Sequence, residues 1–262
     1  MDLLTSIDPR FTLSGFFIGL LVGQTGVGGG SLMTPLLILV FGIHPATAVG
    51  TDLLYAAATK TAGTLAHGAH GTVNWRLTGL LASGSVPATI ITVLAMRHIN
   101  PASPESAHIL SVILGVVLLL TALGLLGRGR ILAWTEHRMS WLDGPRRTVL
   151  TVLLGVILGV IVTLSSVGAG AIGVTVMAIL YRKMPLPELV GSDIAHAVPL
   201  TLIAGLGHWM SGSVDGPMLL SLLSGSIPGI IIGTLMSVRM PEAVLRAVLA
   251  VTLLMVGGKL LF

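Results

Sequence analysis

The charged residues of this chain are confined to short intervals, and the segments between them are apolar and long enough to cross a lipid bilayer. The segment from Phe11 to Ile43 contains no charged side chain. Further apolar runs of similar or shorter length occupy residues 77–96, 108–126, 189–210 and 216–238. A hydrocarbon core of about 30 Å requires roughly 20 apolar residues in a helix, so these runs predict transmembrane helices.

The composition agrees with this prediction. Hydrophobic residues make up 53% of the 262 residues, charged residues make up 9%, and the mean hydropathy is +0.98. These values are typical of an integral membrane protein, and we expect one all-α polytopic membrane domain over residues 1–262. The excess of lysine and arginine lies between the apolar runs, where orientation in the bilayer explains it, so we expect no binding of nucleic acid.

The chain contains an internal duplication. Residues 50–95 align with residues 191–236, and roughly a third of the aligned positions are identical, which indicates a repeat. The matched pairs include Gly50 with Gly191, Asp52 with Asp193, His67 with His208, and Pro87 with Pro228. We therefore predict two repeats, at about 11–127 and 148–262, joined by a cytoplasmic linker at about 128–147.

A glycine-rich stretch interrupts the first apolar segment and recurs in the second repeat. The sequence TGVGGGS at 25–31 aligns with SSVGAGA at 165–171. Four glycines within five residues oppose a continuous helix by about 4 kcal/mol, so we expect a break between half-helices at 11–24 and 31–43. The free N–H groups of a half-helix suit an anion, whereas close helix packing is the alternative role for such glycines.

Candidate substrate-binding residues follow from these two breaks. They are Thr25, Gly26, Val27, Gly28, Gly29, Gly30 and Ser31 in the first copy, and Ser165, Ser166, Val167, Gly168, Ala169 and Gly170 in the second.

The path of the broken segments determines the topology. If each segment crosses once, the repeats run parallel, and eight basic residues lie inside against five outside. If each segment turns back as a helical hairpin before three transmembrane helices, the repeats are inverted, and ten basic residues lie inside against three outside. The second count obeys the positive-inside rule better, so we predict inverted repeats.

Asp52 and Asp193 occupy equivalent positions in helices expected to cross the membrane. A carboxylate there costs about 2.5 to 3.5 kcal/mol, so it needs a partner, a cavity or a proton. Proton coupling is the functional hypothesis, and a polar contact between helices is the structural one. Lys60 lies on roughly the same helix face as Asp52 and is a candidate to meet the substrate, whereas the second copy has Thr201.

The histidines and serines allow several interpretations. His67 and His208 are equivalent, and they could act as gates, as proton carriers or only as interfacial residues. The histidines show no metal-ligand spacing, so we expect no metal and no cofactor. Ser-Gly-Ser at 83–85 and 224–226 raises the alternative of an intramembrane hydrolase, but its duplication with a following proline favours a packing face.

Four stretches of the chain resemble a known family. They are GVGGGSLMTPLL at 26–37, HPATAVGTDLL at 44–54, HGAHGTVNW at 67–75 and GSVPA at 84–88. They are similar to the sulfite exporter TauE/SafE family of bacterial membrane permeases, and the resemblance extends over nearly the whole chain. It implies a carrier of sulfite, sulfoacetate and related sulfur-containing anions, with the glycine break at 26–30 and Asp52 as positions to carry over.

Together these observations predict a secondary carrier of small anions in the plasma membrane, the inner membrane of the cell. The chain has no nucleotide-binding motif, so we expect an ion gradient or a partner to supply the energy. The expected partners are the anionic substrate and the lipid bilayer, and a homodimer is left open. An anion channel, a metal-cation permease and an intramembrane hydrolase are the competing functions.

Overall fold

A computed structural model of the chain describes residues 7–25, 30–97, 103–138, 144–168, 170–235 and 242–261. These residues form helices and no strands, in agreement with the predicted all-α class. The first half contains α1 (Pro9–Thr25), α2 (Gly30–Leu39), α3 (Pro45–Ala69), α4 (Trp75–Met96) and α5 (Pro104–Arg138). The second half contains α6 (Pro145–Ser165), α7 (Ala171–Leu180), α8 (Leu186–Met210), α9 (Gly216–Leu235) and α10 (Glu242–Leu261).

Within the described residues, five helices are long and apolar enough to cross a membrane: α4, the 104–127 part of α5, α6, α8 and α9. The four transmembrane runs predicted from the sequence coincide with α4, α5, α8 and α9, and the ends differ by a few residues except at the end of α5, which continues to Arg138. The outward surface is apolar, and side chains such as Phe17, Ile91 and Met255 are more than 60% exposed. Such a surface suits contact with lipid, and the protein is a multi-pass membrane protein.

The broken segments consist of unequal pieces. In the second half, α6 has 21 residues and so extends about 31 Å, which is long enough to cross the membrane alone. The following helix α7 has ten residues and extends only about 15 Å. In the first half, α2 also has ten residues and ends at Leu39, four residues before the expected end at Ile43.

Helices extend into both ends of the predicted linker. The sequence places a twenty-residue linker at 128–147, whereas α5 continues to Arg138 and α6 begins at Pro145. Arginine, leucine, alanine and glutamate are good helix formers, so the charged residues after Gly127 extend the helix instead of ending it. Residues 139–143 lie outside the described part of the chain.

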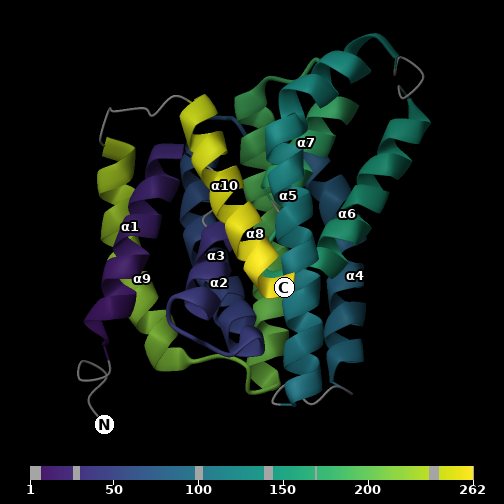
Figure 1. Cartoon of the computed structure of the whole chain (residues 1–262). Helices are drawn as coiled ribbons and strands as arrows, with labels where there is room; N and C mark the ends of the chain where they lie inside the picture. Colours follow the sequence, from purple (N-terminus) through teal and green to yellow (C-terminus); the bar gives the residue numbers. More distant parts are fainter. Residues whose placement is uncertain are drawn as a thin grey trace.

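Each half packs its first helix against the fourth helix of the other half. Thus α1 contacts α9 on one side of the molecule and α6 contacts α4 on the opposite side, while α3 and α8 pack together between them (Figure 1). The last helices of the two halves, α5 and α10, also pack against each other. If each helix is replaced by its equivalent in the other half, the same helix pairs result.

Glycines explain why α1 packs closely against α9 and α6 packs closely against α4. A Cβ atom added to Gly15 or Gly19 of α1 would lie 2.2 to 2.4 Å from the carbonyl oxygens of Leu222 and Ser226 in α9. The equivalent glycines of α6, Gly155 and Gly159, lie in the same way against the carbonyl oxygens of Leu81 and Ser85 in α4. Small residues spaced four apart allow two helix backbones to approach directly, as is common in membranes.

The central helices α3 and α8 run antiparallel. Four contacts pair residues that ascend along α3 with residues that descend along α8: Gly50 with His208, Leu54 with Gly205, Gly63 with Ile194, and His67 with Gly191. Because α3 and α8 occupy equivalent positions in the two repeats, their crossing places the two candidate aspartates on opposite sides of its centre.

Candidate functional site

Both aspartates lie inside the protein. Asp52 of α3 is completely buried, and Asp193 of α8 is 1% exposed. Charged groups are costly in such surroundings unless another group compensates them, so the polar neighbours of each carboxylate are the natural candidates for a functional site.

The Asp52 carboxylate contacts both a short helix and the break of the other half. Thr34 of α2 donates a hydrogen bond of 2.5 Å from its hydroxyl to Asp52 Oδ2. The Ser166 hydroxyl, from the break between α6 and α7, lies beside the same carboxylate. Neither Asp52 Oδ1 nor Ser166 Oγ has a hydrogen-bond partner among the residues that the structure describes.

Ser166 is buried and has an unusual backbone conformation. Ser166 ends α6 in the left-handed conformation, with φ 58° and ψ 0°, which is uncommon for a residue other than glycine. The neighbouring Ser165 hydroxyl instead bonds its own backbone, at Ile161 O and Val167 O. Of the two serines predicted to bind substrate in the second break, only Ser166 therefore keeps an uncommitted hydroxyl.

Asp193 lies against the first turn of α7. A Cβ atom added to Gly173 would lie 2.5 Å from Asp193 Oδ1, and one added to Gly170 would lie 4.0 Å from Asp193 Oδ2. Gly168 and Gly170 both have positive φ, 116° and 114°, so the chain enters α7 through a turn that favours glycine. The end of α7 predicted to attract an anion thus already faces a carboxylate of the protein.

The structure describes only the ends of the first glycine-rich break. Gly26, Val27, Gly28 and Gly29 lie outside the described residues, and so does Ala169 in the second copy. Thr25 ends α1, and Gly30 and Ser31 begin α2. Their predicted role in substrate binding remains a prediction.

Lys60 is the basic residue buried beside these aspartates. It is 6% exposed, and its charge interacts with Asp193 and, in second place, with Asp52. Eight residues of α3 separate Lys60 from Asp52, which corresponds to about 12 Å along the helix. In the antiparallel pair, Lys60 lies close to the centre of the crossing. The arrangement brings one ammonium group between two carboxylates.

Two further polar pairs lie beside the aspartates, and neither was predicted from the sequence. His196 follows Asp193 by three residues, and its Nε2 lies 2.8 Å from Ser85 Oγ of α4. Tyr55 follows Asp52 by three residues, and its hydroxyl lies beside Ser226 of α9. Ser85 and Ser226 are themselves equivalent residues of the two repeats, so the pairs match. A shared polar residue three positions after each aspartate was the available signal.

The two pairs differ in chemistry. Ser85 and His196 are bonded to each other, whereas Tyr55 OH and Ser226 Oγ have no hydrogen-bond partner within the described part of the chain. A hydrolase needs a base that a third group orients, yet His196 Nδ1 also lacks a partner among these residues. The Ser85–His196 pair therefore does not support the hydrolase alternative.

The equivalent histidines His67 and His208 lie in different surroundings. The ring of His67 contacts Thr72 Oγ1 at 2.8 Å and is partly exposed. His208 is 3% exposed, and its Nε2–H donates to Thr163 O at 3.0 Å. The matching sequence positions therefore do not give the two side chains the same accessibility.

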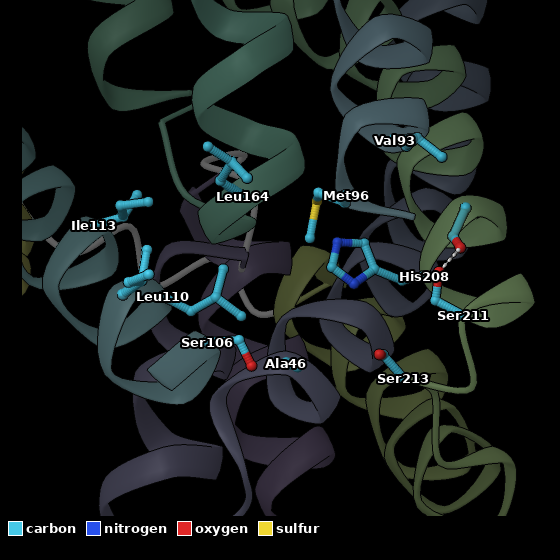
Figure 2. Close-up of a pocket in the computed structure, with 12 residues that line it drawn as sticks. Ala46, Val93, Met96, Ser106, Leu110, Ile113, Leu164, His208, Ser211 and Ser213 are labelled. Atoms are coloured by element: carbon cyan, nitrogen blue, oxygen red, sulfur yellow. Dashed lines mark hydrogen bonds between the residues drawn. The ribbon is translucent and has the colours of Figure 1, made fainter. Parts of the chain in front are cut away.

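A small apolar pocket of about 80 Å³ lies at the His208 end of α8. Figure 2 shows the His208 ring pointing into it beside Met96, with Leu110 and Leu164 on the other side. Leu164 is two residues before Ser166, so the pocket lies next to the second break. Asp52, Lys60 and Asp193 do not line it. Within the described residues, no group of three or more His, Cys, Asp or Glu side chains is arranged to hold a metal ion.

Comparison with known proteins gives consistent matches. The family model described as Sulfite exporter TauE/SafE matches residues 11–260. The chain is 40% identical to "Probable membrane transporter protein YjnA" of Bacillus subtilis (strain 168), over 80% of this chain and 83% of that protein. It is 25% identical to "Probable membrane transporter protein MJ0441" of Methanocaldococcus jannaschii, over 79% and 74% of the two chains. No solved structure matches the chain.

Proposed function

The chain belongs to the TauE/SafE sulfite exporter family, and from that membership we propose that it exports small sulfur-containing anions such as sulfite or sulfoacetate. It is a membrane transporter, and the proposal adds the substrate, the direction and a secondary, gradient-driven mechanism in the plasma membrane. The observation that carries the mechanism is the buried Lys60, which lies between Asp52 and Asp193 at the crossing of α3 and α8.

Lys60 supplies the positive charge that an anion needs inside the membrane. Its ammonium group already interacts with Asp193, and Asp193 lies against the first turn of α7. An entering anion would replace Asp193 next to Lys60 and at the N–H groups of α7, both of which favour negative charge. Anion binding would thus change the charge balance of Lys60 and the two aspartates, and a coupling ion bound at a buried aspartate would link it to an ion gradient.

The pocket beside His208 supports an access route. It lies between the end of α8 and the second break, and His208 is the titratable residue in its described lining. We infer that an anion passes this pocket on its way to Lys60 and that His208 acts as a gate.

The test of this function is transport by the purified protein in liposomes. We expect saturable uptake of radiolabelled sulfite, accelerated by an imposed ion gradient, and inhibition by sulfoacetate. Asp52→Asn and Asp193→Asn keep the side-chain size and remove the charge, so gradient-driven uptake should fall while sulfite exchange at equal ion concentrations persists. Full gradient-driven transport in both variants would contradict coupling through these aspartates. Uptake that does not saturate would instead favour the anion channel.

We also propose that the two repeats are inverted in the membrane. The antiparallel crossing of the equivalent helices α3 and α8 supports this arrangement, and so does the count of ten basic residues inside against three outside.

The absence of cysteine allows a direct test of this topology. Single cysteines at Ser140 and Pro185 should both resist an impermeant thiol reagent added outside intact cells, because both loops are expected in the cytoplasm. Permeabilised cells provide the control, since both positions should then react. Labelling of Pro185 from outside would favour parallel repeats.

A further inference from the structure

The buried charges of the described residues do not balance. The buried Asp, Glu, Lys and Arg side chains are Asp52, Asp193 and Lys60, which together give two carboxylates and one ammonium group; two histidines, His196 and His208, are also buried. Lys60 interacts more strongly with Asp193 than with Asp52. A buried charge without compensation is costly, so Asp52 is the carboxylate that needs a further positive charge.

The surroundings of Asp52 offer oxygen atoms as possible ligands. Thr34 of α2 contacts Asp52 Oδ2, and Ser166 of the break lies at the carboxylate. Tyr55 lies on the same face of α3, one turn further along, and Ser226 of α9 lies beside its hydroxyl.

Four of these atoms are buried, and each lacks a hydrogen-bond partner in the described structure: Asp52 Oδ1, Ser166 Oγ, Tyr55 OH and Ser226 Oγ. Buried polar groups in proteins are nearly always satisfied, so these four atoms, with Ser166 Oγ beside Asp52 and Ser226 Oγ beside the Tyr55 hydroxyl, are available to a ligand.

The other half does not repeat this arrangement. The residue equivalent to Thr34 is Val174, which has no hydroxyl, and the residue equivalent to Ser166 is Gly26. His196 takes the place of Tyr55 and is bonded to Ser85. Asp193 Oδ1 also lacks a hydrogen-bond partner among the described residues, but the charge of Lys60 interacts more with Asp193 than with Asp52. The oxygen-lined arrangement therefore occurs at Asp52 and not at Asp193.

We propose that Asp52, with the hydroxyl groups of Thr34, Ser166, Tyr55 and Ser226, binds one monovalent alkali cation, for which Na⁺ is the probe. Oxygen ligands suit hard cations, and a single carboxylate matches a single positive charge, whereas a divalent ion would require more acidic groups. Cation sites at interrupted helices are a general feature of secondary transporters. The assignment of this cation as the coupling ion rests on the proposed transport function, but its binding does not.

The experiment measures thermal stability of the purified full chain in detergent, without any anionic substrate. NaCl is compared with the chloride of N-methyl-D-glucamine at constant pH and ionic strength. A ligand that binds only the folded protein raises its stability by mass action, so Na⁺ should raise the melting temperature in a saturable manner. Asp52→Asn should abolish this shift.

Two milder variants replace site residues by those of the equivalent positions. Ser166→Gly removes the hydroxyl and suits the positive φ, and Thr34→Val follows Val174. Each should raise the Na⁺ concentration for half-maximal shift by about tenfold, as expected for the loss of one contact to a charged group. Thr121→Val is the control, because Thr121 is a buried hydroxyl that bonds Val117 O in α5, away from the site.

The outcomes separate this inference from the transport proposal. A Na⁺ shift that is absent in the wild type, or unchanged in Asp52→Asn and Ser166→Gly, overturns the cation site. A stability that responds to pH but not to Na⁺ assigns Asp52 to a proton and also overturns it. Sulfite uptake that continues in liposomes without Na⁺ then leaves the anion carrier intact. Conversely, a Na⁺ shift in a protein that does not move sulfite supports the site and refutes the carrier.

Discussion

Replacing Gly225 with alanine is expected to prevent close packing of α9 against α1 and to lower the melting temperature of the protein sharply. The added Cβ would lie 1.8 Å from the carbonyl oxygen of Thr12 and 2.8 Å from its carbonyl carbon. Both are backbone atoms, so the whole of α1 would have to move. Overpacking typically costs about 1 to 3 kcal/mol and occasionally more, and a contact this close with backbone atoms is expected to lie at the upper end. The measurement is thermal unfolding of the purified protein in detergent.

Two further variants test this prediction, one as the equivalent change in the other half and one as a control. Gly84→Ala is the equivalent change in the other half, with the added Cβ 2.1 Å from Val152 O, and it should destabilise α4 against α6 to a similar degree. Gly79→Ala is the control, because no atom lies within 4 Å of an added Cβ there. This change should be neutral or stabilise α4 by up to about 1 kcal/mol. Equal melting temperatures for all three variants would contradict backbone contact at these glycines.

Lys60→Met is expected to abolish sulfite uptake and to destabilise the protein. Methionine keeps the length of the apolar stem but leaves Asp52 and Asp193 without their shared counter-charge. Removal of one partner from buried charges typically costs about 3 to 5 kcal/mol. Thermal unfolding measures the loss of stability, and uptake of radiolabelled sulfite into liposomes measures the loss of function.

A double variant separates these two effects. Asp193→Asn in the Lys60→Met background removes the carboxylate that interacts most with Lys60 and should restore much of the stability. It should not restore uptake, because no ammonium group remains to receive the anion. Restored uptake would show that Lys60 acts only by neutralising Asp193. Unchanged stability in Lys60→Met would contradict its role as counter-charge.

Much of the fold follows from the sequence. Apolar runs of spanning length predicted α4, α5, α8 and α9, because the length of a transmembrane helix is set by the bilayer. The continuation of α5 to Arg138 was missed because charged residues were taken as a sign of a loop, although arginine has a high helix propensity.

The site was less predictable. The sequence singled out Asp52, Lys60 and Asp193 as candidates, because charged residues are rare within apolar runs, and the structure buries all three. It did not reveal Tyr55 or His196, because tyrosine and histidine at equivalent positions do not look like a repeated motif. Their serine partners lie on helices of the opposite half, and no local pattern encodes such a contact. Ser166 was one of several candidates, and its left-handed backbone and its place beside Asp52 distinguish it from Ser165.

The packing of α1 against α9 and of α4 against α6, which joins helices of opposite halves, also affects how the protein is made. During synthesis, α1 and α4 enter the membrane before α6 and α9 exist, and these later helices are the ones that cover their glycine faces. Membrane insertion of the first half is therefore complete before its tightest interfaces can form. In that interval its glycine faces lie open to lipid or to neighbouring chains. Assembly of the bundle waits for the ribosome to deliver the second half, so neither half forms its native packing alone.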